Sequence, residues 1–464
     1  MKKVLAIALV LVVLSATLVA CGPTSSGKTE IVFYHTMGQN LRDVLDRYIV
    51  EFEKLYPQYD IQHKQVGGYE DVRDQVNSEI IAGKQPNIAY CYPDHVALYN
   101  IAGAVQTLDE YINSTEVVER SDGATEIVGL TDEQKADFIE GYYQEGAQFG
   151  DGKMYSMPFS KSTEVLYYNK TYFEENKLTV PTTWDEMEEV CAKIKEIENA
   201  KGNTDIIPLG YDSEDNWFIT MCEQLNSGYT QVDKENTSNQ FIFNNDANKE
   251  FVKKFSDWYA KGYVTTKALN GNAYTSDLFT KGKSMMCIGS SAGASNQIPD
   301  PVGGKYPFEA DITSIPQIDP ENPKVISQGP SVTILKNANK DEVLGSWLFV
   351  KFLTTNAAFQ ADFSIASGYV PVIKSTMEDP AFAEHLSGAN GHEGLVALSS
   401  LVCMEQESAY YASPAFYGSS FARDEVGLLM QKCLVECSQN LDNLDAFLDQ
   451  VFEAAVQNCI QAIS

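Results

Sequence analysis

Aromatic and small polar side chains stand where several expected strands end. Tyr69 follows a pair of glycines, Tyr92 and Asp94 close a short apolar run, Trp217 opens an expected helix, and Tyr369 sits in a Gly-Tyr-Val-Pro turn. A cleft lined by such residues can stack a ring on the apolar face of a polyol and hydrogen-bond its hydroxyls. Each stack contributes about 0.5–1.5 kcal/mol beyond the buried area. The chemistry on offer is recognition of a hydroxylated molecule.

Signatures of catalysis are missing from the sequence. It contains no phosphate-binding loop, no zinc-protease motif, no nucleophile elbow and no dinucleotide fingerprint. None of the 64 acidic residues forms a pair that stands out from solvated helix faces, and the five histidines do not cluster with cysteines at the spacing of zinc ligands. We therefore expect a protein that is not an enzyme and that needs no metal or cofactor.

The elements that must position these residues alternate between strands and helices. In the first part of the chain the pattern predicts strands at 30–34, 61–66 and 88–92, with helices at 39–56, after Tyr69 and at 94–102. Later strands are expected at 164–168, 206–211, 284–288, 312–318 and 332–335. Such alternation predicts an α/β fold, in which ligands bind beyond the carboxyl ends of the strands.

The first twenty residues have the features of a secretory signal. Lys2 and Lys3 precede an apolar run, and small residues lead to Cys21. A cysteine at this place is typical of a bacterial lipobox, so we expect a signal peptide over 1–20, lipidation of Cys21 and a flexible tether over 21–29. The alternative is an uncleaved membrane anchor. No later segment reaches eighteen consecutive apolar residues, so no other membrane span is expected.

Length and charge narrow the remaining possibilities. The chain of 464 residues is too long for one compact core and suits two lobes. Its net charge of −30 opposes contact with phosphate backbones and disfavours a nucleic-acid partner. Eight cysteines remain after Cys21, and their spacing does not decide between buried free thiols and disulfides.

Five colinear segments carry a family resemblance. PFSKSTEVLYYNKTYFEENKLTVPTTWDEM (158–187), together with IVFYHTMGQN, QPNIAYCY, DLFTKGKSMMCIGSSAG and FSIASGYVPV, resembles family 1 extracellular solute-binding proteins of ABC transporters. Within that family the chain looks closest to the glycerol-3-phosphate-binding type. The resemblance implies a two-lobed α/β fold with a cleft and several crossings, with 30–157 and 311–354 in the N-lobe and 158–310 and 355–464 in the C-lobe.

The resemblance also implies the residues of the ligand site. They are Met37, Gln39, Tyr69, Tyr92, Asp94, Ser162, Trp217, Gly329, Tyr369, Ser420 and Arg423. Close relatives place a phosphate-binding arginine just after a Pro-Phe-x-x-Gly segment near the C-terminus. Here that place holds serine, and Arg423 lies three residues beyond Ser420, so the choice among a neutral sugar, a glycerol phosphate and a glycerophosphodiester stays open.

Three functions follow as hypotheses. The first, which the resemblance favours, is a monomeric lipoprotein, anchored through Cys21 at the outer face of the cytoplasmic membrane or in the periplasm, that captures a hydroxylated solute by cleft closure. It would deliver that solute to the permease subunits of an ABC importer. The second is an exported lipoprotein hydrolase acting on a carbohydrate or phosphodiester, which needs a positioned acid and base. The third is a surface adhesion module, which needs no small-molecule cleft.

Overall fold

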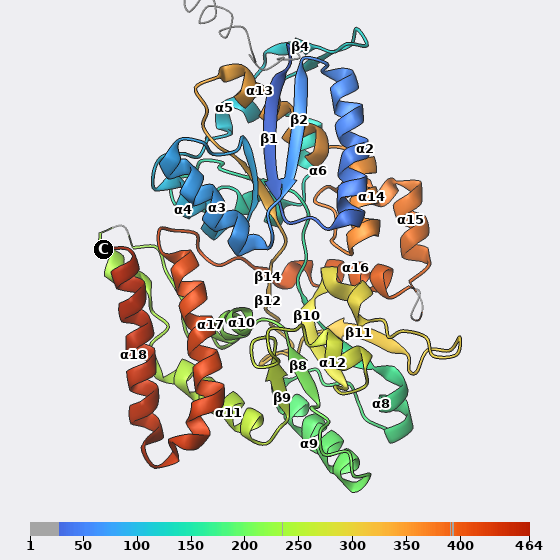
Figure 1. The fold of residues 1–464 in the computed structure, drawn as a ribbon, viewed down its shortest axis with the longest axis vertical. Helices are drawn as coiled ribbons and strands as arrows, with labels where there is room; N and C mark the ends of the chain where they lie inside the picture. Colours follow the sequence, from blue (N-terminus) through green and yellow to red (C-terminus); the bar gives the residue numbers. More distant parts are fainter. Residues whose placement is uncertain (1–26, 234, 390, 392–393) are drawn as a thin grey trace, which may run out of the picture.

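The computed structural model describes residues 27–233, 235–389, 391 and 394–464. The expected signal sequence, the expected lipidation site Cys21 and most of the expected tether lie outside these residues. Within the described part, no helix is long and apolar enough to cross a membrane. Figure 1 shows an upper and a lower lobe, which we call the first and the second lobe. The long helices α17 (Ser419–Glu436) and α18 (Leu444–Ala462) run along one side of the second lobe.

The first lobe is built on a five-stranded sheet with the order β2-β1-β3-β13-β6. Its strands are β1 (Thr29–His35), β2 (Tyr59–Gln65), β3 (Ile88–Cys91), β6 (Met157–Pro158) and β13 (Ser331–Ile334). Strand β1 is parallel to β2 and β3, whereas β13 is antiparallel to β3 and β6. The three parallel strands confirm the alternating pattern predicted for the first hundred residues.

Helices from two distant parts of the chain cover this first sheet. They are α2 (Gln39–Leu55), α3 (Tyr69–Ala82), α4 (Pro93–Asn100), α13 (Lys340–Thr354) and α14 (Ala357–Ser367). The apolar face of α2 buries Leu45, Tyr48 and Phe52, and the Phe52 ring meets that of Phe349 on α13 edge to face at 5.1 Å. Each such buried side chain contributes about 1.5–3 kcal/mol. The first lobe therefore needs chain segments that are about 300 residues apart in sequence.

The second lobe carries another five-stranded sheet, with the order β11-β7-β10-β8-β9. Its strands are β7 (Glu164–Asn169), β8 (Leu209–Tyr211), β9 (Val264–Thr266), β10 (Met286–Ser290) and β11 (Ala310–Ser314). Strand β7 lies antiparallel between β10 and β11, and β8 lies parallel between β10 and β9. The strand predicted at 164–168 and the helix after it are confirmed by β7 and α8 (Lys170–Asn176).

Helix α9 (Trp184–Ala200) begins at the capping box that the sequence predicts. The Thr183 hydroxyl accepts a hydrogen bond from the Glu186 N–H at 3.2 Å, and the Glu186 carboxylate accepts one from the Thr183 N–H at 3.2 Å. Removal of such a cap costs about 1 kcal/mol. The cap sets where α9 starts, and Trp184 at its first position enters the core of the second lobe.

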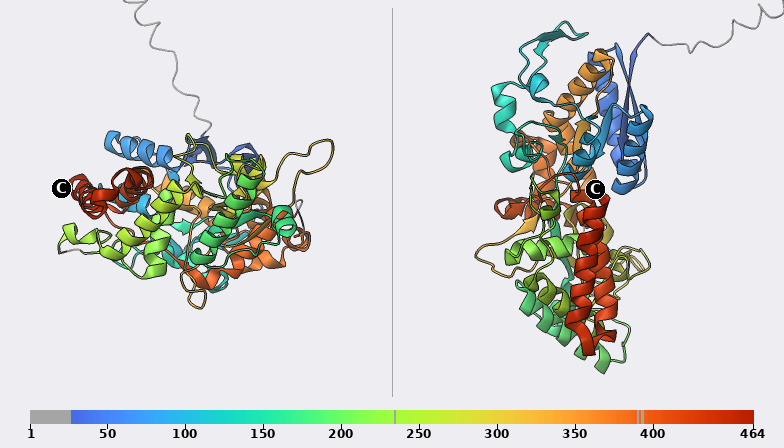
Figure 2. Two further views of the ribbon diagram at one scale, coloured as in Figure 1. Left: turned by 90° about the horizontal axis from the view of Figure 1, so that it is seen from below. Right: turned by 90° about the vertical axis from the view of Figure 1, so that its left-hand side faces the viewer.

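That core is rich in aromatic rings from α9, α10 (Glu214–Leu225) and α11 (Asp246–Ala260). The Trp217 ring stacks on Tyr211 at 4.7 Å and lies 4.4 Å from the Phe255 ring. Helix α17 packs against both α10 and α11, with α18 outside it (Figure 2). The C-terminal helices are thus an integral part of the second lobe.

The chain crosses between the lobes at several places. One crossing joins β6 to β7, and another runs from β11 through β12 (Val325–Ile326) to β13. A later one leads from α15 (Pro380–Ser387) to α16 (Leu395–Glu405) and on to β14 (Tyr410–Tyr411). Strands β12 and β14 pair in parallel between the lobes (Figure 1). The two-lobed α/β fold with multiple crossings is confirmed.

Two segments lie in the other lobe from the one predicted. Strand β11, assigned by the sequence to the N-lobe from residue 311, pairs with β7 and forms an edge of the second sheet. Helix α14, assigned to the C-lobe from residue 355, packs on α2, where the Phe359 and Tyr48 rings meet edge to face at 5.1 Å. Edge pairing of a short strand and the burial of Phe359 decide these placements, and neither contact is visible in the local pattern.

Shorter elements complete the two lobes. They are β4 (Val117–Glu119), β5 (Thr125–Ile127), α5 (Asp109–Ile112), α6 (Asp132–Asp137), α7 (Glu140–Glu145) and α12 (Ser276–Thr280). Helix α7 contacts β6 at the first crossing, so its last residue, Glu145, reaches the region between the lobes.

Candidate functional site

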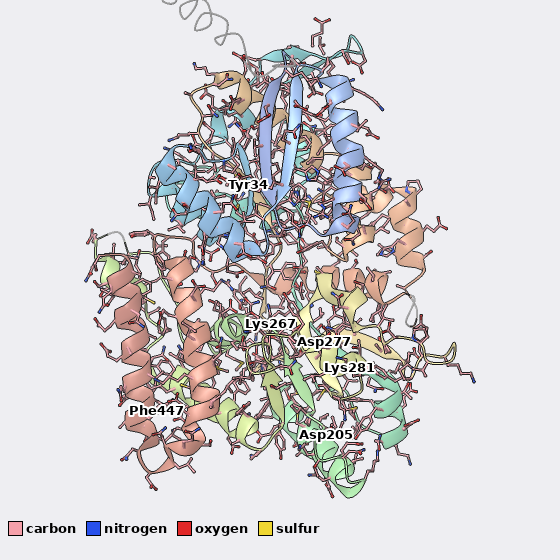
Figure 3. All side chains as sticks on the ribbon, viewed as in Figure 1. Tyr34, Asp205, Lys267, Asp277, Lys281 and Phe447 are labelled. Carbon is pink, nitrogen blue, oxygen red and sulfur yellow. The ribbon has the colours of Figure 1, made fainter. Side chains whose placement is uncertain are left out.

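A pocket lies between the two lobes, where α4, the crossing segments and the start of α17 meet. It is lined by Tyr92, Pro93, Asp94, Glu145, Tyr229, Ile326, Ser327, Gln328, Gly329, Ala412, Ser413, Pro414, Ser419 and Arg423. It encloses about 50 Å³, far less than the roughly 300–1,000 Å³ of a typical small-molecule site. The lobes therefore stand close together here, and Figure 3 shows side chains throughout the space between their ribbons.

The start of α4 brings Tyr92 and Asp94 to the pocket. Tyr92 is the N-cap residue, Pro93 occupies the first turn, where its missing N–H is not needed, and Asp94 follows. The Asp94 Oδ1 atom accepts a hydrogen bond from the His95 N–H at 3.1 Å, whereas Oδ2 is buried and makes no hydrogen bond. A carboxylate at this place is favoured by the helix dipole. Asp94 thus offers the pocket a free acceptor.

Arg423 reaches this carboxylate from the second lobe. Its Nη1 atom donates to Asp215 Oδ2 at 2.7 Å and to Asn216 Oδ1 at 2.6 Å, and its Nε atom lies 3.7 Å from Asp94 Oδ2. Burial opposes the charge of Arg423, but the carboxylates of Asp215 and Asp94 outweigh burial and raise the pKa of the guanidinium. Arg423 therefore stays charged and connects the two lobes.

A cluster of tyrosines stands beside the pocket in the first lobe. The Tyr69 ring stacks on Tyr92 at 4.3 Å and is nearly parallel to Tyr90 at 5.8 Å, and its hydroxyl lies 3.2 Å from that of Tyr369. Burial raises the pKa of Tyr69 and Tyr92 well above the usual value, so both phenols are neutral. The structure thus brings together three residues that the sequence predicts for the site.

Gly329 lies in the pocket wall at a crossing between the lobes. Its φ of +89° belongs to the left-handed region, and a Cβ there would stand 2.6 Å from the Ser160 carbonyl oxygen. Only glycine allows the two crossing segments to approach this closely. Gly329 shapes the wall with its backbone and presents no side chain to a ligand.

A second cross-lobe contact lies just outside the pocket. Arg73 on α3 donates from Nη1 to Ser420 Oγ at 3.0 Å and lies 3.2 Å from Asp424 Oδ2. Ser420 is therefore buried at the lobe interface and is not among the residues that line the pocket. Helix α17 meets the first lobe through both Arg73 and Asp94.

Four more predicted residues are not among those that line the pocket, and their assignment to its lining is corrected. Met37 is buried in the core of the first lobe, and Gln39 is exposed and bonds to Arg42 and Asp43. Ser162 is buried with its backbone paired to Gln328. Trp217 is fully buried in the second core because α10 turns this ring towards Tyr211.

Sequence reasoning missed several lining residues. Glu145 is buried and forms an ion pair with Lys161, and its Oε1 atom accepts a hydrogen bond from the Ser327 hydroxyl. Ser327 and Ser413 stand next to segments that the resemblance singled out, so their neighbourhood was a usable signal. Glu145 ends helix α7 and Tyr229 follows helix α10, and neither carries such a signal, since only the folded chain brings them to the pocket.

In the part of the chain that the structure describes, the cysteines form no disulfide bonds, and no candidate metal site is found. All eight cysteines there are buried free thiols. No group of three or more His, Cys, Asp or Glu side chains among the described residues is arranged to hold a metal ion. The cysteine spacing left open whether these residues are free thiols or disulfides, and in the structure they are free thiols.

Comparisons with known proteins agree with this architecture. Residues 47–387 match the family model described as bacterial extracellular solute-binding protein. The sn-glycerol-3-phosphate-binding periplasmic protein UgpB of Shigella flexneri is 25% identical over 383 residues, covering 78% of this chain and 79% of that protein.

Solved structures show the same fold. UgpB from Mycobacterium tuberculosis in complex with glycerophosphocholine has a TM-score of 0.72 at 16% identity, covering 94% of this chain and 98% of that chain. The maltose/maltodextrin-binding domain MalE from Bdellovibrio bacteriovorus, bound to maltotriose, has a TM-score of 0.68 at 18% identity, covering 94% and 100%.

Proposed function

Because this chain belongs to the family of bacterial extracellular solute-binding proteins, we propose that it captures its solute in the pocket between its two lobes. The solute is of the sugar or glycerol-phosphate type, and the loaded protein delivers it to the permease of an ABC importer. The observation that supports this most is that both lobes contribute polar groups to one pocket, Asp94 from the first and Arg423 from the second.

Closure of the lobes is the proposed mechanism. A solute that touches both lobes stabilises the closed state over the open one. A shift from 1% to 99% closed requires about 5.5 kcal/mol of preference for the closed state. The Tyr92 ring and the Asp94 carboxylate from the first lobe, together with Tyr229 and Arg423 from the second, supply contacts that form together only when the lobes meet.

Membrane attachment through Cys21 is part of the same proposal. A lipid on this cysteine would keep the receptor at the membrane face where the permease stands, and the tether after it would let a monomeric receptor reach the permease. The support is the signal-like sequence of residues 1–20 and the small residues before Cys21.

The hydrolase hypothesis finds less support at this pocket. Hydrolysis needs one carboxyl that donates a proton and another that acts as base or nucleophile. Both pocket carboxylates lie against cations, Asp94 near Arg423 and Glu145 on Lys161. We therefore propose that the protein binds and releases its solute without making or breaking a bond.

Thermal unfolding with a panel of solutes tests the proposed function. The panel contains glucose, maltose, maltotriose, glycerol, sn-glycerol-3-phosphate and glycerophosphocholine. A solute at a hundredfold excess over its Kd stabilises the folded protein by about 2.7 kcal/mol. We expect at least one member to raise Tm, and we expect Asp94→Asn to reduce that rise.

Asp205→Asn is the matched control, because it removes one carboxylate from the exposed surface of the second lobe, well away from the pocket (Figure 3). It should respond to the solute as the wild type does. If no member of the panel changes Tm, the proposed solute class is wrong.

A further inference from the structure

Among the described residues, each cation that borders or contacts the pocket wall faces a carboxylate. Three carboxylates border it or contact its lining residues, namely Asp94, Glu145 and Asp215, against the two cations Arg423 and Lys161. The five groups together carry one net negative charge. The whole chain, these groups included, carries a formal net charge of −30. A phosphate ester therefore meets a site whose balance opposes it.

Arg423 is the cation best placed to meet a solute, and two of its three nitrogens already face polar partners. One nitrogen of the guanidinium, Nη1, lies within 2.7 Å of Asp215 and 2.6 Å of Asn216, and Nε faces Asp94 at 3.7 Å. Phosphate recognition by arginine needs the planar fork to be open for two parallel hydrogen bonds. If Arg423 turned to a phosphate, Asp215 and Asp94 would lose their partner beside a second anion.

Lys161 is even less accessible. Its side chain is 1% exposed, and its ammonium group is bonded to Glu145, which also accepts the Ser327 hydroxyl. Arg73, the next cation along the interface, is bonded to Ser420 and lies against Asp74 and Asp424. Each cation near the pocket thus has a carboxylate partner of its own.

Two oxygens in the pocket wall make no hydrogen bond to the described residues, and both suit hydroxyls. Asp94 Oδ2 and Ser413 Oγ both lie in the pocket wall, both are buried, and neither makes a hydrogen bond within the described chain. A carboxylate oxygen only accepts, so its natural partner is a donor such as a solute O–H. A fully ionised phosphate group offers acceptors alone, so it cannot itself donate a hydrogen bond to Asp94.

We propose that this pocket selects an uncharged hydroxylated solute and rejects phosphate esters, and that Asp94 and Asp215 determine this specificity by occupying Arg423. The inference rests on the proposed function, since it assigns the solute class of the same pocket. It separates this chain from the glycerol-3-phosphate-binding relative that it resembles in sequence. Arg423 is paired with carboxylates and connects the two lobes. An arginine without such partners could bind an anion instead.

Calorimetric titration of the wild-type protein tests the charge selection directly. The uncharged probes are glucose, maltose, maltotriose and glycerol, and the phosphorylated probes are sn-glycerol-3-phosphate and glycerophosphocholine. We expect an uncharged probe to bind and both phosphorylated probes to bind at least a hundredfold more weakly than the best uncharged one. Tight binding of a phosphorylated probe with no binding of an uncharged one overturns this inference while it supports the proposed function. Failure of all six probes overturns both.

Two variants add a gain-of-function test. Asp215→Asn and Asp94→Asn keep the size of each side chain and remove one negative partner of Arg423. We expect the double variant to bind sn-glycerol-3-phosphate at least tenfold more tightly than the wild type, and Asp205→Asn to leave this affinity unchanged. If the double variant retains its fold by circular dichroism and gains no affinity, Asp94 and Asp215 are not the determinants. If the double variant fails to fold, the titration of the wild-type protein still tests whether the pocket prefers uncharged over phosphorylated solutes.

Discussion

Arg423 Nε lies 3.7 Å from Asp94 Oδ2, and this contact joins helix α17 of the second lobe to helix α4 of the first. The same α17 helix meets Arg73 of the first lobe through Ser420 and Asp424. Two charged contacts at the start of one helix therefore span the interface. Because Asp94 and Arg423 also line the pocket, lobe closure and solute contact share side chains.

The contact outside the pocket allows closure to be tested alone. Arg73→Gln removes the cross-lobe pair with Asp424 without altering a lining residue. Such partly exposed pairs contribute about 0.2–1 kcal/mol, so we expect the Kd of the bound solute to rise by up to about fivefold. Calorimetry measures the affinity, and small-angle X-ray scattering should show a larger radius of gyration without solute. Lys283→Gln, which removes an exposed pair within the second lobe, should change neither quantity.

The buried pair at the crossing should show strong coupling between its members. Lys161→Met leaves the Glu145 carboxylate buried without its partner, which costs about 3–5 kcal/mol. Adding Glu145→Gln removes the unpaired charge, so the double variant should regain much of this loss. Urea unfolding measures both free energies. A double variant that is no more stable than Lys161→Met would contradict this prediction.

Trp217 and Tyr92 separate stability from binding. Trp217 is fully buried in the second core, so Trp217→Ala should lower the free energy of unfolding by about 3–5 kcal/mol and leave the solute affinity of the folded protein unchanged. Tyr92 lines the pocket, so Tyr92→Ala should weaken solute binding with a smaller loss of stability. Urea unfolding and calorimetry on both variants test the contrast. A loss of solute affinity in folded Trp217→Ala would show that Trp217 contributes to the binding site.

The local sequence pattern of strands and helices is sufficient to predict the site residues that follow the strands of the first sheet. Tyr69, Tyr92 and Asp94 follow the parallel strands β2 and β3 of the first sheet, and the carboxyl ends of such strands meet at one edge. Trp217 misled the prediction because its helix is apolar on most sides, and its sequence does not tell which side faces the core. Glu145 and Tyr229 reach the pocket only through the fold, since neither follows a strand.

The division into lobes shows the same limit. The pattern of apolar residues in β11 predicts a strand, yet the choice between two sheets depends on which edge is open to pair. Helix α14 was separated from the first lobe because its partner, α2, lies some 300 residues earlier. Family resemblance supplied the two-lobed fold, and the tertiary contacts decided the boundaries.

Glu164 predicts a pH dependence of stability. Burial raises the pKa of its carboxyl from 4.5 to about 8, although the Tyr211 hydroxyl donates a 2.6 Å hydrogen bond to it, which opposes the rise. Between these values the folded state keeps a proton that the unfolded chain has lost. The contribution of Glu164 is therefore full below about pH 4 and falls by up to about 1.4 kcal/mol per pH unit as the pH rises towards 8.

Glu164→Gln removes this titration. We expect the free energy of unfolding of the variant, relative to wild type, to increase steadily from pH 5 to pH 8 in urea unfolding experiments. Glu223→Gln is a control in the same lobe, because burial also raises the pKa of the Glu223 carboxyl. Its stability relative to wild type should change less with pH, because Glu223 is less buried than Glu164. A difference between wild type and Glu164→Gln that does not vary with pH would contradict the assignment.

The most direct measurement is a crystal structure of the protein with the solute that the titration identifies. We predict an uncharged solute between the lobes, with a hydroxyl within hydrogen-bond distance of Asp94 Oδ2 and with Arg423 still bonded to Asp215. A solute bound elsewhere, such as the surface groove lined by Leu178, Val180 and Ile197, would contradict the pocket assignment. A phosphate group held by Arg423 would contradict the proposed charge selection.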